Sequence, residues 1–191
     1  MTLRVYVVDN GGQWTHREWR VLTYLGVDSK IVPNTTPYDD LQDLDGLVLS
    51  GGAPRVGLQD TLGRCGDFLD KAAYPVLGIC AGEQFMASHY GGKVAPGKVP
   101  EFGKTELILD DPTGGTMLKG LPPKSIVWES HNDEVVVVPD EFRVTAHSAN
   151  CAVQAMEHKH KPRYGLQFHP EVEHTEYGEQ IFRNFLETCR R

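Results

Sequence analysis

The chain has 191 residues, which is enough for one domain with a substantial hydrophobic core. Its hydrophobic content of 40% and charged content of 24% are ordinary for a folded globular protein. The net charge of −7 argues against nucleic acid as a main partner, and no apolar run approaches the length of a membrane span. We therefore expect a single domain, residues 1–191, that binds neither nucleic acid nor a membrane.

The cysteines indicate the compartment. Cys65, Cys80, Cys151 and Cys189 show no paired spacing, which fits free thiols in a reducing cytoplasm better than a disulfide framework. The first residues, 1–8, are typical of a strand and too short and too soon charged for a signal peptide. The sequence therefore predicts a cytoplasmic protein.

In the first half of the chain, short apolar runs alternate with segments of helical spacing. The expected strands are 3–9, 27–32, 44–50 and 75–79, and the expected helices are 14–25, 62–73 and 83–89. Such alternation implies a parallel sheet with helices on both faces.

In the second half, short strand candidates follow one another and are separated by turn residues. They are 105–109, 125–128, 135–138, 143–146, 153–156 and 164–169. A closing helix, 176–189, carries one apolar stripe, made of Ile181, Phe182, Phe185 and Leu186. The sequence thus predicts a three-layer α/β/α sandwich, with a mostly parallel central sheet that has a mixed or antiparallel extension.

The stretch around Cys80 carries the chemistry. An apolar strand, 75–79, turns through Gly78-Ile79-Cys80-Ala81-Gly82 into a helix, so Cys80 lies at a sharp strand-to-helix turn. The helix N-terminus favours a thiolate, and the backbone N–H of Ala81 is placed to donate to an oxyanion. A nucleophile fits this setting, whereas the alternative is a buried structural cysteine.

A cysteine nucleophile needs a base and a group that orients the base. Among eight histidines, His169 stands out, because Pro170 favours extended geometry and Glu171 then lies on the same side of the chain. A glycine loop, 50–54, ends a neighbouring parallel strand, so its N–H groups are placed to donate to an oxyanion as well. The alternatives are a solvated strand-end histidine and an ordinary turn.

Together these residues carry a family resemblance. Residues 78–84, Gly-Ile-Cys-Ala-Gly-Glu-Gln, resemble the Gly-x-Cys-x-Gly-x-Gln signature of the class I (triad) glutamine amidotransferases. Residues 168–171 resemble the His-Pro-Glu segment of that family, and residues 50–52 resemble its oxyanion strand. The three motifs occur in order and span essentially the whole chain.

The resemblance implies a mechanism for hydrolysis of the L-glutamine amide. Cys80 would attack the side-chain amide, His169 would shuttle the proton and Glu171 would orient His169. Gly52 and Ala81 would donate to the oxyanion. The products would be glutamate and ammonia, formed through a glutamyl thioester.

Further segments resemble the glutaminase part of GMP synthetases, namely 100–105, 128–134 and 169–175. This implies that Gln84, Ser130 and His131 hold the substrate, and that Asp133 and His174 lie at a partner interface. The partner would be a separate ATP-pyrophosphatase subunit that aminates XMP to GMP, with ATP and Mg²⁺ on that subunit. We expect no cofactor and no metal in this chain.

Three alternatives remain open at this point. The same glutaminase chemistry could serve carbamoyl phosphate, anthranilate or p-aminobenzoate synthesis. The chain could be an inactive module that regulates its partner, although the triad is intact. It could also be another cysteine hydrolase or a redox sensor, which would leave Gln84 and the His-Pro-Glu segment without an explanation.

Overall fold

The structure, a computed structural model, describes residues 2–190, so residues 1 and 191 of the expected domain lie outside the described range. The strands in this range are β1 (Val5–Asn10), β2 (Ile31–Pro33), β3 (Gly46–Gly52), β4 (Val76–Ile79), β5 (Lys93–Leu109), β6 (Lys124–Val137), β7 (Phe142–His147), β8 (Ala155–His158) and β9 (Arg163–Leu166). The α-helices are α1 (Thr15–Tyr24), α2 (Cys65–Lys71), α3 (Ala81–His89) and α4 (Gly178–Cys189). Short 3₁₀ turns cover Tyr38–Leu41 and Val56–Leu58.

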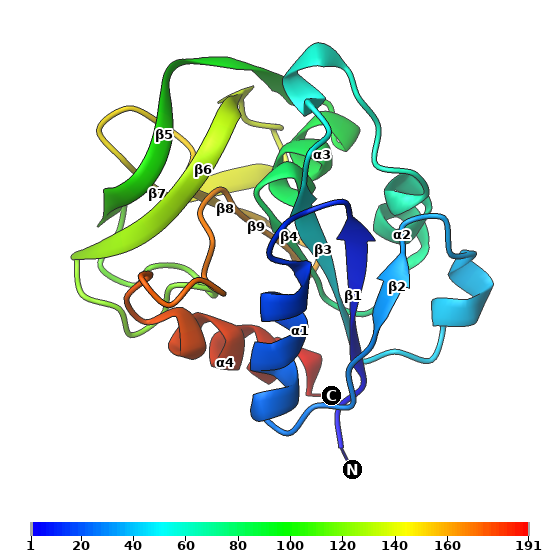
Figure 1. Cartoon of the computed structure of the whole chain (residues 1–191). Helices are drawn as coiled ribbons and strands as arrows, with labels where there is room; N and C mark the ends of the chain where they lie inside the picture. The colour runs from blue at the N-terminus through cyan, green and yellow to red at the C-terminus, as the bar shows by residue number, and fades with distance from the viewer. Residues whose placement is uncertain (1, 191) are drawn as a thin grey trace.

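All these strands form one sheet in the order β2-β1-β3-β4-β9-β8-β7-β5-β6. The first five strands in this order pair in parallel. From β9 onward each pair is antiparallel, and the long strands β5 and β6 curl away at the far edge (Figure 1). The expected combination of a parallel sheet and an antiparallel extension is confirmed.

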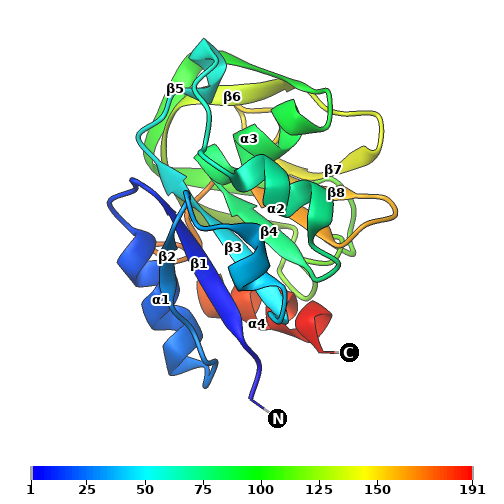
Figure 2. The ribbon, with the colours of Figure 1, turned by 90° about the vertical axis from the view of Figure 1, so that its right-hand side faces the viewer.

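Helices cover both faces of the parallel part. Alternate strand residues point to opposite faces, so Val7 and Leu77 belong to one core, and Val8 and Val76 to the other. The first core packs beneath α1 and α4, which contributes the predicted apolar stripe, and the second packs beneath α2 and α3 (Figures 1 and 2). The predicted α/β/α layering is therefore confirmed.

Some expected elements differ from those observed. The segments 125–128 and 135–138 are not separate strands, because β6 runs without interruption from Lys124 to Val137. Strand β2 covers only the end of the expected 27–32 segment, and β5 begins twelve residues before the expected residue 105. Strand β9 ends at Leu166, so His169 lies in the loop after the strand.

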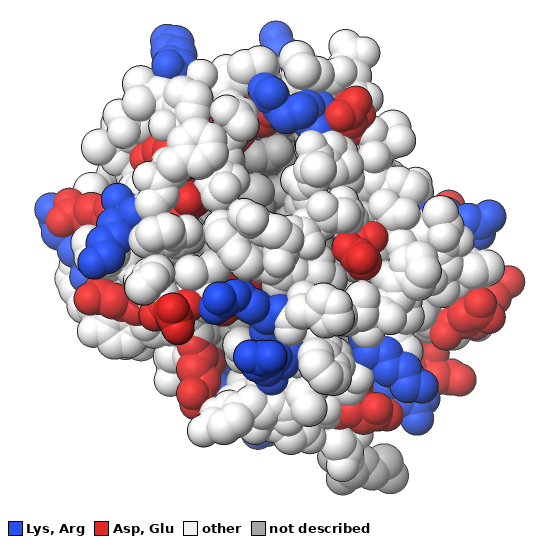
Figure 3. All heavy atoms as spheres, in the orientation of Figure 1, with Lys and Arg blue, Asp and Glu red and all other residues white. Residues whose placement is uncertain are grey.

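On the face shown in Figure 3, basic and acidic side chains are interspersed. No helix among residues 2–190 is both long enough and apolar enough to cross a membrane.

Candidate active site

Cys80 occupies a strained turn between β4 and α3. Its φ of 52° lies in the left-handed region, which non-glycine residues rarely adopt. The flanking glycines make this turn possible: a Cβ at Gly82 would lie 2.2 Å from the carbonyl oxygen of Leu49, and one at Gly78 would lie 2.6 Å from the carbonyl carbon of Gly82. Close backbone approach on both sides therefore fixes the thiol at the end of the central strand.

His169 and Glu171 form a buried pair beside this turn. The ring Nδ1 of His169 lies 2.6 Å from Oε1 of Glu171. Burial opposes a charge on the ring, but the Glu171 carboxylate and hydrogen bonds with Cys80 and Glu171 raise the pKa of His169 well above its ordinary value. The carboxylate thus orients the ring and stabilises an imidazolium next to the Cys80 sulfur.

Thr175 fixes the backbone of the His169 loop. Its hydroxyl donates to the His169 carbonyl over 2.7 Å and accepts from the Trp128 N–H over 2.9 Å. The His169 N–H in turn donates to the Trp128 carbonyl. Hydrogen bonds therefore hold His169 next to β6, although His169 lies in the loop after β9.

A cavity of about 230 Å³ opens at the carboxyl ends of β1, β3 and β4. Five of the residues predicted from the sequence line it: Cys80, His169, Glu171, Ser130 and Gly52. The loop after β3 contributes Ser50, Gly51, Gly52 and Ala53. The structure thus brings together four segments that lie far apart in the chain.

The remaining wall of the cavity comes from residues that we did not predict. These are Gly11, Gly12, Gln13, Trp14, Thr15 and Glu18, which follow β1 and begin α1. The indole of Trp14 packs edge-on against the His169 ring, with ring centroids 4.4 Å apart. The sequence did offer one indication of these residues. The segment follows a parallel strand, and ligand sites form at the carboxyl ends of such strands.

The glycine loop approaches His169 and Cys80 most closely at Gly51. A Cβ at Gly51 would lie 3.2 Å from Cε1 of His169 and 3.4 Å from Cβ of Cys80. Gly52 lies one residue further on, where an added Cβ would lie 2.2 Å from the carbonyl oxygen of Asn10. Ala81 is the first residue of α3, directly after Cys80. The assignment of Gly52 and Ala81 as oxyanion donors stays a prediction.

Gln84 and His131 do not line this cavity. The amide of Gln84 donates to the carbonyl of Asp133 and to Oε1 of Gln167. The ring nitrogens of His131 face the carbonyl of Asp133 at 3.0 Å and Oε2 of Glu101 at 3.1 Å. Both side chains thus brace the β6 backbone that presents Ser130, and their role in substrate binding stays a prediction.

Asp133, which we expect at a partner interface, is buried in the fold, and its part in a partner contact stays a prediction. Its side chain is 4% exposed and is held by Arg55, which follows the glycine loop. Gly57 adds a backbone N–H to the same carboxylate. His174, by contrast, is half exposed, so it remains available at the surface.

Two further carboxyls lie close to Cys80. Glu83 and Glu129 are buried, and no side-chain oxygen of either has a hydrogen-bond partner within residues 2–190. Burial is the main reason that the pKa of each is raised well above its ordinary value, and a charge on Cys80 would raise both further. The raised pKa of each group favours its neutral form, so burial opposes a negative charge on Glu83 next to the thiol.

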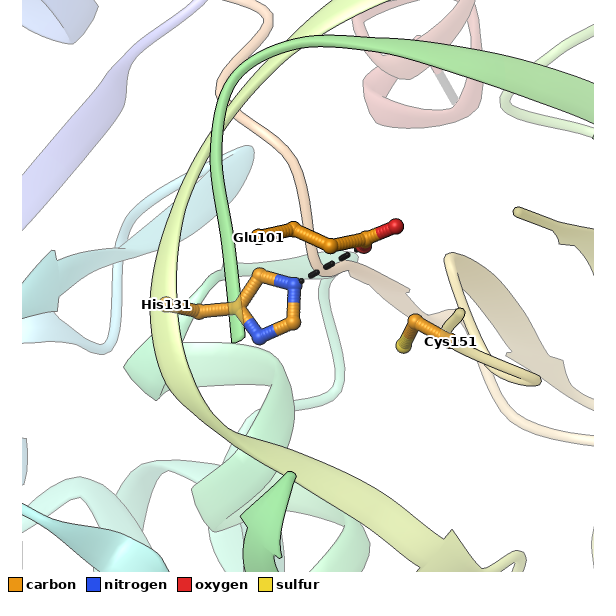
Figure 4. Close-up of side chains that lie close together, drawn as sticks. All are labelled: Glu101, His131 and Cys151. Atoms are coloured by element: carbon orange, nitrogen blue, oxygen red, sulfur yellow. Dashed lines mark hydrogen bonds and ion pairs between the residues drawn. The ribbon is translucent and has the colours of Figure 1, made fainter. Parts of the chain in front are cut away.

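A second group of glutamate, histidine and cysteine lies deeper in the fold. Figure 4 shows Glu101, His131 and Cys151, whose potential ligand atoms lie within 4.8 Å of one another. The thiol of Cys151 is fully buried and donates to the Val153 carbonyl, and burial raises its pKa strongly. This group has the same residue types as a catalytic triad. However, Cys80 and not Cys151 has the strained backbone and lines the cavity.

Known proteins resemble this chain along nearly its whole length. The sequence model of the family "Glutamine amidotransferase class-I" matches residues 6–189. A protein from Thermoplasma volcanium, named as a glutamine-hydrolyzing GMP synthase subunit, is 54% identical over 100% of this chain and 94% of its own length. One of the same name from Pyrococcus abyssi is 47% identical over 97% of this chain and 98% of its own length.

Two solved structures show the same fold. A crystal structure from Thermoplasma acidophilum, described as that of a GMP synthase subunit, has a TM-score of 0.94 at 55% identity, covering 99% of this chain and 94% of that one. A glutamine amidotransferase from Thermotoga maritima has a TM-score of 0.72 at 19% identity, covering 98% of this chain and 82% of that one. The second likeness concerns the fold alone.

Proposed function

Since this chain belongs to the class-I glutamine amidotransferases, we propose that it hydrolyses glutamine to glutamate and ammonia with Cys80, His169 and Glu171 as its catalytic triad. The observation that carries this proposal is the 2.6 Å contact between His169 and Glu171, in the cavity that also holds Cys80. The strained geometry of Cys80 presents its sulfur to that cavity.

In the proposed mechanism, the Cys80 thiolate attacks the side-chain amide carbon of glutamine and forms a tetrahedral adduct. Backbone N–H groups of Gly52 and Ala81 stabilise the oxyanion. The His169 imidazolium gives its proton to the amide nitrogen, and ammonia leaves as the glutamyl thioester forms. His169 then accepts a proton from the attacking water, and the thioester releases glutamate and the thiolate. Glu171 keeps the imidazole in the required tautomer throughout.

We propose that the ammonia serves the conversion of XMP to GMP on a separate ATP-pyrophosphatase subunit, which binds ATP and Mg²⁺. The relatives named as GMP synthase subunits support this acceptor over carbamoyl phosphate, anthranilate or p-aminobenzoate synthesis. His174, half exposed next to the His169 loop, is the residue that we propose for the partner contact. Four free buried thiols support a cytoplasmic location for the complex.

The test combines the chain with its partner subunit, ATP, Mg²⁺ and XMP. With glutamine as nitrogen source we expect GMP formation, and Cys80→Ala abolishes it. Ammonium salt supplied to the Cys80→Ala complex restores GMP formation, because the partner is intact. Cys151→Ser is the matched control, since Cys151 also has a histidine and a glutamate beside it, and it retains glutamine-dependent activity.

Two results would reject parts of the proposal. If Cys80→Ala hydrolyses glutamine at the wild-type rate, the triad assignment is wrong. If the wild-type chain hydrolyses glutamine but no GMP forms, although the partner makes GMP from ammonium, only the proposed acceptor is wrong. If the partner subunit with its nucleotides activates hydrolysis, the partner binds the active conformation of this chain more tightly than the inactive one.

A further inference from the structure

Glu18 holds an unusual place in the cavity wall. Thr15, Glu18 and Leu22 form the buried stripe of α1, the positions where a helix normally packs apolar side chains. The residue is 1% exposed, yet it carries a carboxyl group. A carboxyl is expensive to bury unless its polar atoms are used, so its function has to be sought among its neighbours.

Those neighbours are the glycine loop and the triad. Burial and the nearby charge of Glu171 raise the pKa of Glu18, and the Ser50 hydroxyl and the Gly51 backbone act in the opposite direction. The Thr15 hydroxyl, one turn earlier on α1, lies 2.8 Å from the Ser50 hydroxyl. Glu18 therefore connects α1 to the loop that contacts Cys80 and His169.

Two buried oxygen atoms in this region have no partner among residues 2–190. They are Oε2 of Glu18 and Oε2 of Glu171. The other oxygen of Glu171 is already bonded to Nδ1 of His169. Both residues line the same cavity, and the charge of Glu171 acts on Glu18, so a proton shared between the two carboxyls, directly or through a water, would satisfy both atoms. Burial, followed by the Glu171 charge, raises the pKa of Glu18, and this favours its protonated form as the donor.

We propose that Glu18 is a positioning residue of the triad, which in its protonated form donates a hydrogen bond to Oε2 of Glu171, directly or through one cavity water. This bond fixes the carboxylate that orients His169. The inference deepens the proposed glutaminase function and rests on it. Glu18 does not act on the substrate; it acts through Glu171.

The proposal predicts a pH dependence. The ionisable groups that face Glu18 in the cavity are Glu171, His169 and Cys80, and Asp9 lies behind Thr15. On the adjacent α4, Glu179 and Arg183 pair with each other at the solvent surface. When pH rises through the raised pKa of Glu18, the donor is lost and a second negative charge appears beside Glu171. Activity that depends on this bond is therefore present below that pKa and lost above it.

The experiment compares Glu18→Gln, which keeps a donor but cannot ionise, with Glu18→Met, which has similar length and no donor. Steady-state glutamine hydrolysis is measured against pH, and protonation of His169 is followed by NMR of isotope-labelled histidine, with His169→Ala to identify its signals. Glu179→Gln on the exposed face of α4 is the control.

We expect Glu18→Gln to lose less kcat than Glu18→Met and to move the alkaline limb of the profile to higher pH. Glu18→Met should lower kcat about tenfold or more with KM unchanged, since misplaced catalytic groups slow the reaction without weakening substrate binding. Its His169 ring should titrate at a different pH from that of the wild type. Glu179→Gln should match the wild type.

Equal kcat and equal pH profiles for Glu18→Gln and Glu18→Met would overturn the proposal, and so would a wild-type alkaline limb in Glu18→Gln. If Glu18→Met does not fold, the nearly isosteric Glu18→Gln decides the question through its alkaline limb. A wild-type protein that does not hydrolyse glutamine would reject the proposed function instead. The His169 titration in both Glu18 variants would then still test the positioning role.

Discussion

The guanidinium of Arg55 binds the buried carboxylate of Asp133 with two hydrogen bonds, Nε to Oδ2 at 2.8 Å and Nη2 to Oδ1 at 2.6 Å. Arg55 follows the glycine loop, and Asp133 lies on β6 three residues after Ser130. The pair therefore ties together two walls of the cavity that carry no direct backbone pairing.

We predict that Arg55→Ala lowers both the thermal midpoint of unfolding and kcat/KM for glutamine, because it leaves a buried carboxylate without a counter-charge. Arg55→Lys should be intermediate, since lysine keeps the charge but cannot form the bidentate contact. Lys124→Ala, at the exposed pair with Glu106, is the control and should change little. Thermal melts and steady-state kinetics of the three variants provide the comparison. If Arg55→Ala and Lys124→Ala had the same thermal midpoint and the same kcat/KM, this account would be contradicted.

A glutamine-analogue electrophile should label Cys80 alone. Burial raises the pKa of Cys65 and of Cys189 to about 12 and raises that of Cys151 further, so these thiols hold very little thiolate at neutral pH. Peptide mapping by mass spectrometry after labelling identifies the modified residue, and excess glutamine should slow the labelling. A label on any of the other three cysteines in the folded protein would count against Cys80 as the nucleophile.

Glu171→Gln should damage activity less than His169→Ala. No other residue can replace His169 as the base. In the Glu171→Gln variant, by contrast, Thr175 still holds the His169 loop and Trp14 still packs against the His169 ring. By comparison with other triads we expect His169→Ala to lose more than about a thousandfold in kcat and Glu171→Gln to lose less. Glutaminase assays of both variants, with folding checked by circular dichroism, decide the order. A greater loss for Glu171→Gln would assign Glu171 a direct part in proton transfer.

The sequence was a good guide where one physical rule dominated. Gly78 and Gly82 flank Cys80 because two backbones pass closely there, and this followed from their spacing alone. Strand β6 was harder to predict. Its buried and exposed residues alternate as in any strand with one buried face, but the buried ones include Glu129, His131 and Asp133. Because we expected buried strand residues to be apolar, we predicted two short strands in place of one long strand. Only the tertiary partners Glu101 and Arg55 show why polar side chains continue the inward pattern.

The same limitation applied to α1. Glu18 occupies a core position in the helical pattern, and a glutamate there looks solvated in a sequence. Its environment depends on Ser50 and Glu171, which lie far away in the chain. Likewise, the sequence analysis places Asp133 at a partner interface, whereas the fold buries its side chain beneath Arg55.

The two loop glycines should respond differently to alanine. A Cβ at Gly51 meets only side chains of the site at close range, Cε1 of His169 at 3.2 Å and Cβ of Cys80 at 3.4 Å. A Cβ at Gly52 would lie 2.2 Å from the carbonyl oxygen of Asn10, which is backbone and cannot give way. Gly51→Ala should therefore fold and lose activity, whereas Gly52→Ala should lose stability. Melting temperatures and kcat for both variants test this. A stable Gly52→Ala variant with wild-type activity would contradict the predicted clash with the Asn10 carbonyl.

Stability should fall as pH rises from mildly acidic to alkaline, because Glu18, Glu83 and Glu129 are buried acids whose pKa values are raised, chiefly by burial. In the unfolded chain they titrate near about 4.3. Between that value and the raised one the folded state holds more protons than the unfolded state, so stability decreases with increasing pH. His169 acts in the same direction, since its raised pKa gives stability that is lost as pH rises through it.

Glu101 opposes this trend only at the acid end. Burial would raise its pKa, but hydrogen bonds from His131 and Ser148 lower it, so its contribution is lost as pH falls through the lowered value. The stability maximum should thus lie at mildly acidic pH. Replacing both Glu83 and Glu129 by glutamine should flatten the decline above it, while the exposed Glu173→Gln should leave the slope unchanged. Denaturant midpoints measured at several pH values give the slopes, and equal slopes for the double variant and the wild type would show that these two acids are not neutral in the folded protein.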